Sequence, residues 1–179
     1  MWNSDKNVYL SMFFGHDGSV TCGDFTPDGK IVCTGSDDGT QRIWNPRNGE
    51  NLQIVEDHPY HREGLTCLTI SPDSLLAITR AKDSSVHMVN ITSGKVISSL
   101  TAHIDSIECI GLSASFPWLA TGSMDHKLII WDLEHSLPCL TCDHEVRSHS
   151  LAWLGKSRFI ATGTADGRIR IWDSLLGIV

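Results

Sequence analysis

Part of a residue spacing that recurs along the whole chain lies in the segment Thr121-Gly122-Ser123-Met124-Asp125-His126-Lys127-Leu128-Ile129-Ile130-Trp131-Asp132. Counting from His103, a threonine follows after 18 residues, an aspartate after 22 and a tryptophan after 28. The same offsets define three complete sets of residues and a fourth set with valine at the tryptophan position. The sets are His16, Thr34, Asp38 and Trp44; His61, Thr79 and Asp83, with Val89; His103, Thr121, Asp125 and Trp131; and His144, Thr162, Asp166 and Trp172. This regularity predicts a tandem repeat of about 40 residues, the signature of a radial β-sheet array.

Each repeat has the pattern of four short antiparallel strands. A strand after the histidine leads into a turn such as Thr26-Pro27-Asp28-Gly29, where Pro and Asp favour a β-turn. The next strand carries the threonine, and the third ends on the tryptophan; Arg168 to Trp172 alternates as a half-buried strand should. A fourth, outer strand precedes the next histidine. The predicted repeats are residues 15–56, 57–101, 102–142 and 143–179, the last with an incomplete outer strand, and residues 1–14 form the end of a preceding blade.

The four spaced residues can form a hydrogen-bonded set, which we call a tetrad. A buried indole N–H needs an acceptor, and a threonine hydroxyl can accept from it while donating to a histidine. The other histidine nitrogen can then face the aspartate, so that three strands and a loop are joined. The second repeat lacks the indole, and it has Arg80-Ala81 where the others have Gly-Ser or Gly-Thr. We therefore expect it to be the least rigid repeat.

Three dipeptides carry a resemblance to a known family: Trp44-Asn45, Trp131-Asp132 and Trp172-Asp173, each with a histidine upstream. They resemble the WD-repeat family of β-propellers over essentially the whole chain. The resemblance implies an all-β fold with four four-stranded antiparallel blades. Propellers of this family usually close with about seven blades, which implies that this chain is an open arc of a larger propeller.

Both chain ends fall inside repeats. Trp2 lies 14 residues before His16, as the last tryptophan of an earlier blade would, and only six residues follow Asp173. We therefore expect a fragment or a truncated form. The alternative is a closed four-bladed ring, in which residues 8–14 supply the outer strand of the last blade.

Composition narrows the classes of function. The net charge of −7 and the pI near 5.6 argue against binding to nucleic-acid phosphates and favour a basic protein partner. The sequence has no apolar run of membrane-spanning length, and its start lacks the apolar core of a signal peptide. We expect a cytoplasmic protein without membrane insertion, with the nucleus as a second location.

The candidate chemical groups favour neither metal binding nor catalysis. Cys22, Cys67 and Cys109 occupy one repeated position, which indicates core packing. Cys139 and Cys142 form a C-x-x-C pair, but residues three apart on a strand face opposite sides. The Thr, His and Asp of a tetrad could mimic a nucleophile, base and orienting acid, yet a constellation repeated four times fits a structural role. We predict no enzyme activity, no metal, no cofactor and no small-molecule ligand.

The resemblance implies that function resides on a protein-binding face. In WD-repeat propellers, three positions per blade commonly carry binding: the third and fifth residues after the histidine and the residue before the turn aspartate. These positions hold Ser19, Thr21, Asp37; Gly64, Thr66, Lys82; Ser106, Glu108, Met124; and Arg147, His149, Ala165. Met124 is the most suggestive, because a flexible apolar side chain beside a tight turn suits a binding surface.

The resemblance also implies a non-catalytic interaction scaffold. Related propellers are linked to cell migration, or act as the chaperone of a large-subunit ribosomal protein, in which an acidic face holds a basic segment. The alternative is a generic adaptor, such as a ubiquitin-ligase substrate receptor or a histone reader. A reader of methylated lysine needs an aromatic cage, and the positions given above hold no aromatic residue other than His149.

Overall fold

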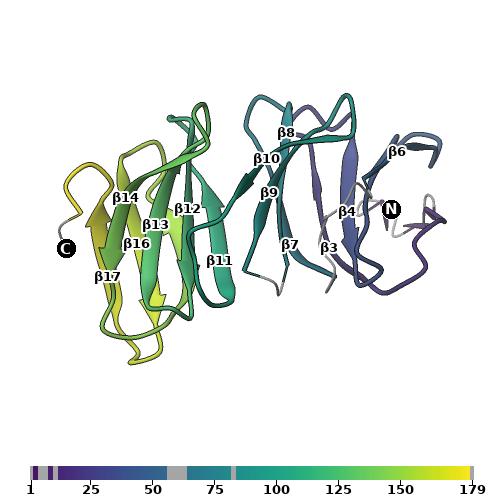
Figure 1. Ribbon diagram of the computed structural model, residues 1–179. Coiled ribbons are helices and arrows are strands. Elements are labelled where there is room, and N and C mark those ends of the chain that lie inside the picture. Colours follow the sequence, from purple (N-terminus) through teal and green to yellow (C-terminus); the bar gives the residue numbers. More distant parts are fainter. Residues whose placement is uncertain (1, 4–7, 10–11, 56–63, 82–83, 178–179) are drawn as a thin grey trace. The chain divides into compact units, whose positions relative to one another are not determined.

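The computed structural model describes residues 2–3, 8–9, 12–55, 64–81 and 84–177, and its described elements are all β-strands (Figure 1). Three sheets have four strands in chain order, a fourth has three, and a short hairpin lies near the N-terminus. The hairpin is β1 (Trp2–Asn3) and β2 (Val8–Tyr9). The first sheet comprises β3 (Val20–Phe25), β4 (Val32–Ser36), β5 (Gln41–Trp44) and β6 (Asn51–Val55). The second comprises β7 (Leu65–Ile70), β8 (Leu76–Ala81), β9 (Val86–Asn90) and β10 (Lys95–Leu100).

The last two sheets repeat this arrangement. The third comprises β11 (Ile107–Leu112), β12 (Trp118–Ser123), β13 (Lys127–Asp132) and β14 (Leu137–Asp143). The fourth comprises β15 (Ser148–Trp153), β16 (Phe159–Thr164) and β17 (Ile169–Asp173). The predicted all-β architecture of repeated antiparallel sheets is confirmed. Among the described residues there is no helix with the length and apolar character needed to cross a bilayer.

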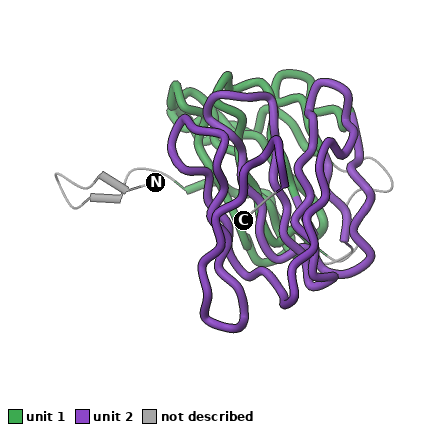
Figure 2. Tube along the Cα trace, turned by 90° about the vertical axis from the view of Figure 1, so that its left-hand side faces the viewer, with its two compact units in different colours: residues 1–79, 88–97 green, residues 80–87, 98–179 purple. Residues whose placement is uncertain are grey.

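The chain divides into two compact units, which Figure 2 colours separately. Unit 1 consists of residues 1–79 and 88–97, and unit 2 of residues 80–87 and 98–179. Each unit has its own core. In unit 1 the core includes Ile43, Leu65 and Val89, and in unit 2 it includes Leu128, Ile160 and Trp172. The valine that replaces a tryptophan in the second repeat is thus fully buried.

The strands pair with the same irregularity in three sheets. The first two strands shift register between Val20 and Cys22, between Ile107 and Cys109, and between Ser148 and Ser150. A shift of this kind bends a strand and redirects the side chains that follow it. Because it falls at the same distance after each histidine, it belongs to the repeat rather than to one sequence.

Glycines allow neighbouring sheets to approach within each unit. In unit 1, a β-carbon on Gly35 would lie 2.7 Å from Sγ of Cys22 and 2.8 Å from Cδ2 of Leu65. In unit 2, a β-carbon on Gly122 would lie 2.8 Å from Sγ of Cys109 and 3.1 Å from Cβ of Ser148. Both glycines directly follow a tetrad threonine. The first strand of a following repeat therefore rests on a glycine of the preceding one.

Candidate functional site

The third repeat brings its four spaced residues into one hydrogen-bonded set. Nε1 of Trp131 donates to Oγ1 of Thr121 over 2.8 Å, and that oxygen lies 2.8 Å from Nε2 of His103. Nδ1 of His103 lies 2.8 Å from Oδ2 of Asp125. A carboxylate only accepts, so Nδ1 of His103 carries a proton and donates to Asp125, and Nε2 is placed to accept from the threonine hydroxyl. Each polar side-chain group of this tetrad, from the indole N–H to the carboxylate, then has a hydrogen-bond partner.

The aspartate of this tetrad also closes the turn before β13. Its carboxylate accepts the backbone N–H groups of Ile104 at 3.1 Å and Lys127 at 3.0 Å. Burial by itself would raise the pKa of Asp125, but the hydrogen bond from His103 and these two N–H groups outweigh it, so the pKa lies below its usual value. The side chain is therefore an anion that joins the segment before β11 to the turn between β12 and β13.

The first repeat forms the same set. Nε1 of Trp44 donates to Oγ1 of Thr34 over 2.7 Å, and this oxygen lies 2.8 Å from Nε2 of His16. Nδ1 of His16 lies 3.0 Å from Oδ2 of Asp38. Burial would raise the pKa of Asp38, yet hydrogen bonds from Thr40, from the backbone and from His16 lower it overall.

The fourth repeat does not form the complete tetrad that its spacing predicts. Nε1 of Trp172 donates to Thr162 over 2.9 Å, as expected. His144, however, is buried with its ring edge-on to Trp172 at 4.5 Å, and neither ring nitrogen has a hydrogen-bond partner among the described residues. Asp166 is bound instead by Arg170, with Nη2 at 3.1 Å from Oδ2. The predicted His144–Asp166 link is therefore wrong, because a guanidinium occupies the carboxylate that histidine would use.

The altered partners change the pKa values in this repeat. The hydrogen bond from Arg170, followed by that from Thr164, lowers the pKa of Asp166. Burial, and then the positive charge of Arg170, lowers the pKa of His144 to about 4. The imidazole of His144 is therefore neutral near pH 7.

In the second repeat, His61 and Asp83 lie outside the described residues, as does Lys82 of the predicted binding face. Thr79 is buried on β8. Arg80 occupies the position that is glycine in the other repeats, and its guanidinium donates to the carbonyl groups of Ile107 and, over 3.0 Å, of Glu108. Sequence reasoning missed this link. The departure from glycine was visible, but the destination of the arginine side chain was not.

The residues predicted for the binding face lie side by side in pairs. The residue before the turn aspartate donates its backbone N–H to the carbonyl of the third residue after the histidine, in three repeats. These bonds join Asp37 to Ser19 (2.9 Å), Met124 to Ser106 (2.9 Å) and Ala165 to Arg147 (3.1 Å). Ser19, Asp37, Arg147 and His149 are exposed, whereas Thr66, Ser106, Glu108 and Met124 are half-buried.

One predicted face residue has an internal role. Oγ1 of Thr21 donates to the carbonyl of Leu65 at 2.5 Å and lies 3.2 Å from that of Gly35. It therefore joins β3 to β7 within unit 1. A hydroxyl engaged in this way is poorly placed to recognise a partner.

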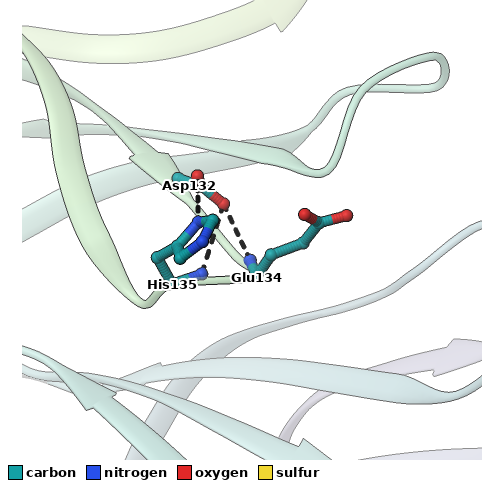
Figure 3. A group of neighbouring side chains, drawn as sticks. All are labelled: Asp132, Glu134 and His135. Carbon is teal, nitrogen blue, oxygen red and sulfur yellow. Dashed lines mark hydrogen bonds and ion pairs between the residues drawn. The ribbon is translucent and has the colours of Figure 1, made fainter.

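A group of acidic and histidine side chains also lies in the loop between β13 and β14 (Figure 3). The carboxylate of Asp132 lies 2.7 Å from Nδ1 of His135, and it accepts the backbone N–H groups of Glu134 at 2.8 Å and His135 at 3.3 Å. The Glu134 side chain extends away from this pair (Figure 3). The hydrogen bond with Asp132 raises the pKa of His135. These bonds are those of a turn that stabilises its own loop.

The C-x-x-C pair lies on β14. Cys139 is exposed, and Cys142 is buried in the core of unit 2. Burial raises the pKa of the Cys142 thiol to about 11, so that it is a neutral core side chain near pH 7.

Comparisons with known proteins agree with this geometry. The family described as "WD domain, G-beta repeat" matches residues 7–45, 94–132 and 137–173. The human angio-associated migratory cell protein is 29% identical over 99% of this chain and 44% of its own length. The rice small ribosomal subunit protein RACK1y is 29% identical over 88% of this chain and 48% of its own length. The crystal structure of the computationally designed Ika4 protein matches with a TM-score of 0.80 and 24% identity, covering 93% of this chain and 98% of that one. The chain thus spans less than half the length of the curated relatives it matches.

Proposed function

This chain belongs to the WD40-repeat family of β-propeller proteins, and from that premise we propose that it is a non-catalytic scaffold that binds a protein partner through a basic segment. The proposal depends on the loops beside the tetrads. In unit 1, Asp17 and Asp37 are exposed there, and in unit 2, Asp105 and Glu145 are exposed. Carboxylates at these loop positions attract lysine and arginine side chains and steer their approach.

The tetrads supply the rigid base for these loops. Asp17 donates its backbone N–H to the carboxylate of Asp38 over 2.9 Å, and Ser123 donates its hydroxyl to the carbonyl of Asp105 over 3.0 Å. The exposed carboxylates of Asp17 and Asp105 are thereby attached to hydrogen-bonded backbone rather than to mobile loops. A charged surface on fixed backbone loses less conformational entropy when it binds.

The same tetrads argue for a non-catalytic role. Where a threonine, a histidine and an aspartate meet, the threonine hydroxyl is occupied by the indole of Trp44 or Trp131, and Thr121 is fully buried. A nucleophile must reach its substrate, and the buried hydroxyl of Thr121 cannot. The polar groups of the tetrads form the hydrogen bonds that join the strands.

The relatives suggest where such a scaffold acts. One relative is named for cell migration and another as a small ribosomal subunit protein. We propose a basic ribosomal protein as the partner class and the cytoplasm, with the nucleus as a second location, as the compartment. A net charge of −7 favours such a partner and opposes binding to nucleic acid.

The test is binding of a lysine- and arginine-rich peptide by calorimetry, with charge reversals at two exposed acidic positions of unit 2. Asp105→Lys changes a carboxylate beside a tetrad, and Glu134→Lys makes the same change of net charge on the loop between β13 and β14. We expect Asp105→Lys to weaken the affinity about two- to fivefold, within the range of exposed charge pairs, and Glu134→Lys to change it less than about twofold. Equal losses would show that only net charge matters, and an absence of binding by the unaltered chain would refute the proposal.

A further inference from the structure

Ile104 is exposed at a position where two other repeats carry an acid. It directly follows the tetrad histidine His103 and is 86% exposed, more than any other large apolar residue in the described part of the chain. In the first and fourth repeats the same position holds Asp17 and Glu145, both exposed. The isoleucine lies outside the core of unit 2, so its apolar surface is open to a partner.

The backbone that carries Ile104 is fixed by hydrogen bonds within its own repeat. Its N–H donates to the carboxylate of Asp125 over 3.1 Å. On the same turn, the N–H of Met124 donates to the carbonyl of Ser106 over 2.9 Å. These bonds hold the segment after His103 alongside the turn that carries Met124. Because this backbone is already ordered, little conformational entropy is lost when a partner covers Ile104.

Exposed carboxylates lie next to Ile104 and Met124 along these loops. Asp105 follows Ile104 directly and is exposed, while Met124 is half-buried. The turn that carries Met124 also accepts the backbone N–H of His144 over 2.7 Å, and the exposed Glu145 follows this histidine. A partner segment that matches both features has an apolar residue next to lysine or arginine, because the first covers apolar surface and the second pairs with carboxylates.

The third repeat has a neighbour on each side within unit 2. Arg80 of β8 donates to the carbonyl of Glu108 on β11 over 3.0 Å, and Ser148 of β15 lies against Gly122 of β12. Both contacts are internal to unit 2. Ile104 is therefore exposed at the end of a sheet that has its neighbours in place.

We propose that the partner's basic segment carries a large aliphatic side chain that covers Ile104, while flanking lysine or arginine side chains pair with Asp105 and Glu145. This inference rests on the proposed function and adds the residue type that gives the contact its specificity. Exposed charge pairs steer a partner but contribute little affinity, whereas covered apolar surface contributes in proportion to its area. The third repeat thus supplies an apolar contact that the acids at the same position of the first and fourth repeats cannot.

Calorimetry with the full 179-residue chain and three peptides tests this proposal. The first peptide has one leucine among lysines and arginines, the second has alanine in place of the leucine, and the third keeps the leucine but has glutamine in place of every lysine and arginine. We expect the leucine peptide to bind about five- to twentyfold more tightly than the alanine peptide. The glutamine peptide should bind about three- to tenfold more weakly than the leucine peptide.

Ile104→Ala removes the apolar contact and keeps the carboxylates. It should weaken binding of the leucine peptide about five- to tenfold and change binding of the alanine peptide less than about twofold. Leu137→Ala is the matched control, because Leu137 is 62% exposed on the outer strand β14 of the same unit, and it should leave both affinities unchanged. Both positions are exposed, so both variants should fold, which far-UV circular dichroism would check.

The outcomes separate this inference from the proposed function. If neither basic peptide binds the unaltered chain, the proposed function fails and this inference fails with it. If the leucine and alanine peptides bind equally, or if Ile104→Ala weakens both alike, the basic partner stands and the apolar contact is overturned. The proposal is also overturned if the glutamine peptide binds as tightly as the leucine peptide, or if Leu137→Ala loses as much affinity as Ile104→Ala.

Discussion

Replacing Thr121 by valine tests whether the tetrad is one connected set. The hydroxyl of Thr121 is fully buried and has two tetrad partners, Trp131 and His103, each at 2.8 Å. Valine keeps the shape of threonine but can neither accept from the indole nor donate to the histidine. Leaving a buried polar group unsatisfied costs about 1–3 kcal/mol. With one donor and one acceptor orphaned, we expect the free energy of unfolding to fall by about 2–4 kcal/mol.

The fourth repeat supplies the matched control, Thr162→Val. Thr162 is also fully buried and accepts from Trp172 over 2.9 Å, but the ring nitrogens of His144 have no hydrogen-bond partner in the described part of the chain. The same change therefore orphans one group and should cost about 1–2 kcal/mol. The difference between the two variants isolates the link to the histidine.

The assay is urea unfolding followed by tryptophan fluorescence, with the slope of free energy against urea concentration compared between variants. A larger loss for Thr121→Val, at an unchanged slope, is the expected result. Equal losses, or a larger loss for Thr162→Val, would show that the histidine contributes nothing through the threonine, and the tetrad would then be only a set of neighbours.

Three further predictions concern the fourth repeat and the tryptophan position. Arg170→Ile should free Asp166 to pair with His144, raising the pKa of His144 above about 4 in an NMR titration; an unchanged pKa would contradict the competition. The folded-state pKa of His144 lies below the ordinary value of 6.5, so the unfolded state binds the proton more readily. The free energy of unfolding should therefore be constant above pH 6.5 and fall by about 3 kcal/mol as the pH drops to 4. Urea titrations should show this pH dependence in the unaltered chain and not in His144→Asn. Trp131→Ala should cost about 3–5 kcal/mol and Val89→Ala about 1–3 kcal/mol in urea titrations, whereas equal losses would show that the indole network adds nothing.

The repeated spacing predicted the sheets and two tetrads because it constrains backbone positions. Strand pairing places a threonine ten residues before a tryptophan on the neighbouring strand, two residues from the residue that pairs with the tryptophan, and the bonds of Trp44, Trp131 and Trp172 all follow that offset. The hydrogen-bond partners of long side chains, which can reach several acceptors, were not predictable in this way. Arg80 and Arg170 lie where the spacing places them, but their guanidinium groups reach partners that spacing does not encode.

Two arginines at the same position of the repeat have different surroundings. Arg42 and Arg170 both lie two residues before a tetrad tryptophan, yet only Arg170 binds the turn aspartate in the described structure. Arg42 is accommodated elsewhere: its guanidinium lies 6.0 Å from the ring centroid of Trp44, and a β-carbon on Gly15 would lie 2.5 Å from its Nη1. The residue before His16 is thus glycine, which leaves room for the arginine, whereas the residue before His144 is Asp143. We infer that a side chain at that position leaves no room for an arginine placed like Arg42, and Arg170 binds Asp166 instead.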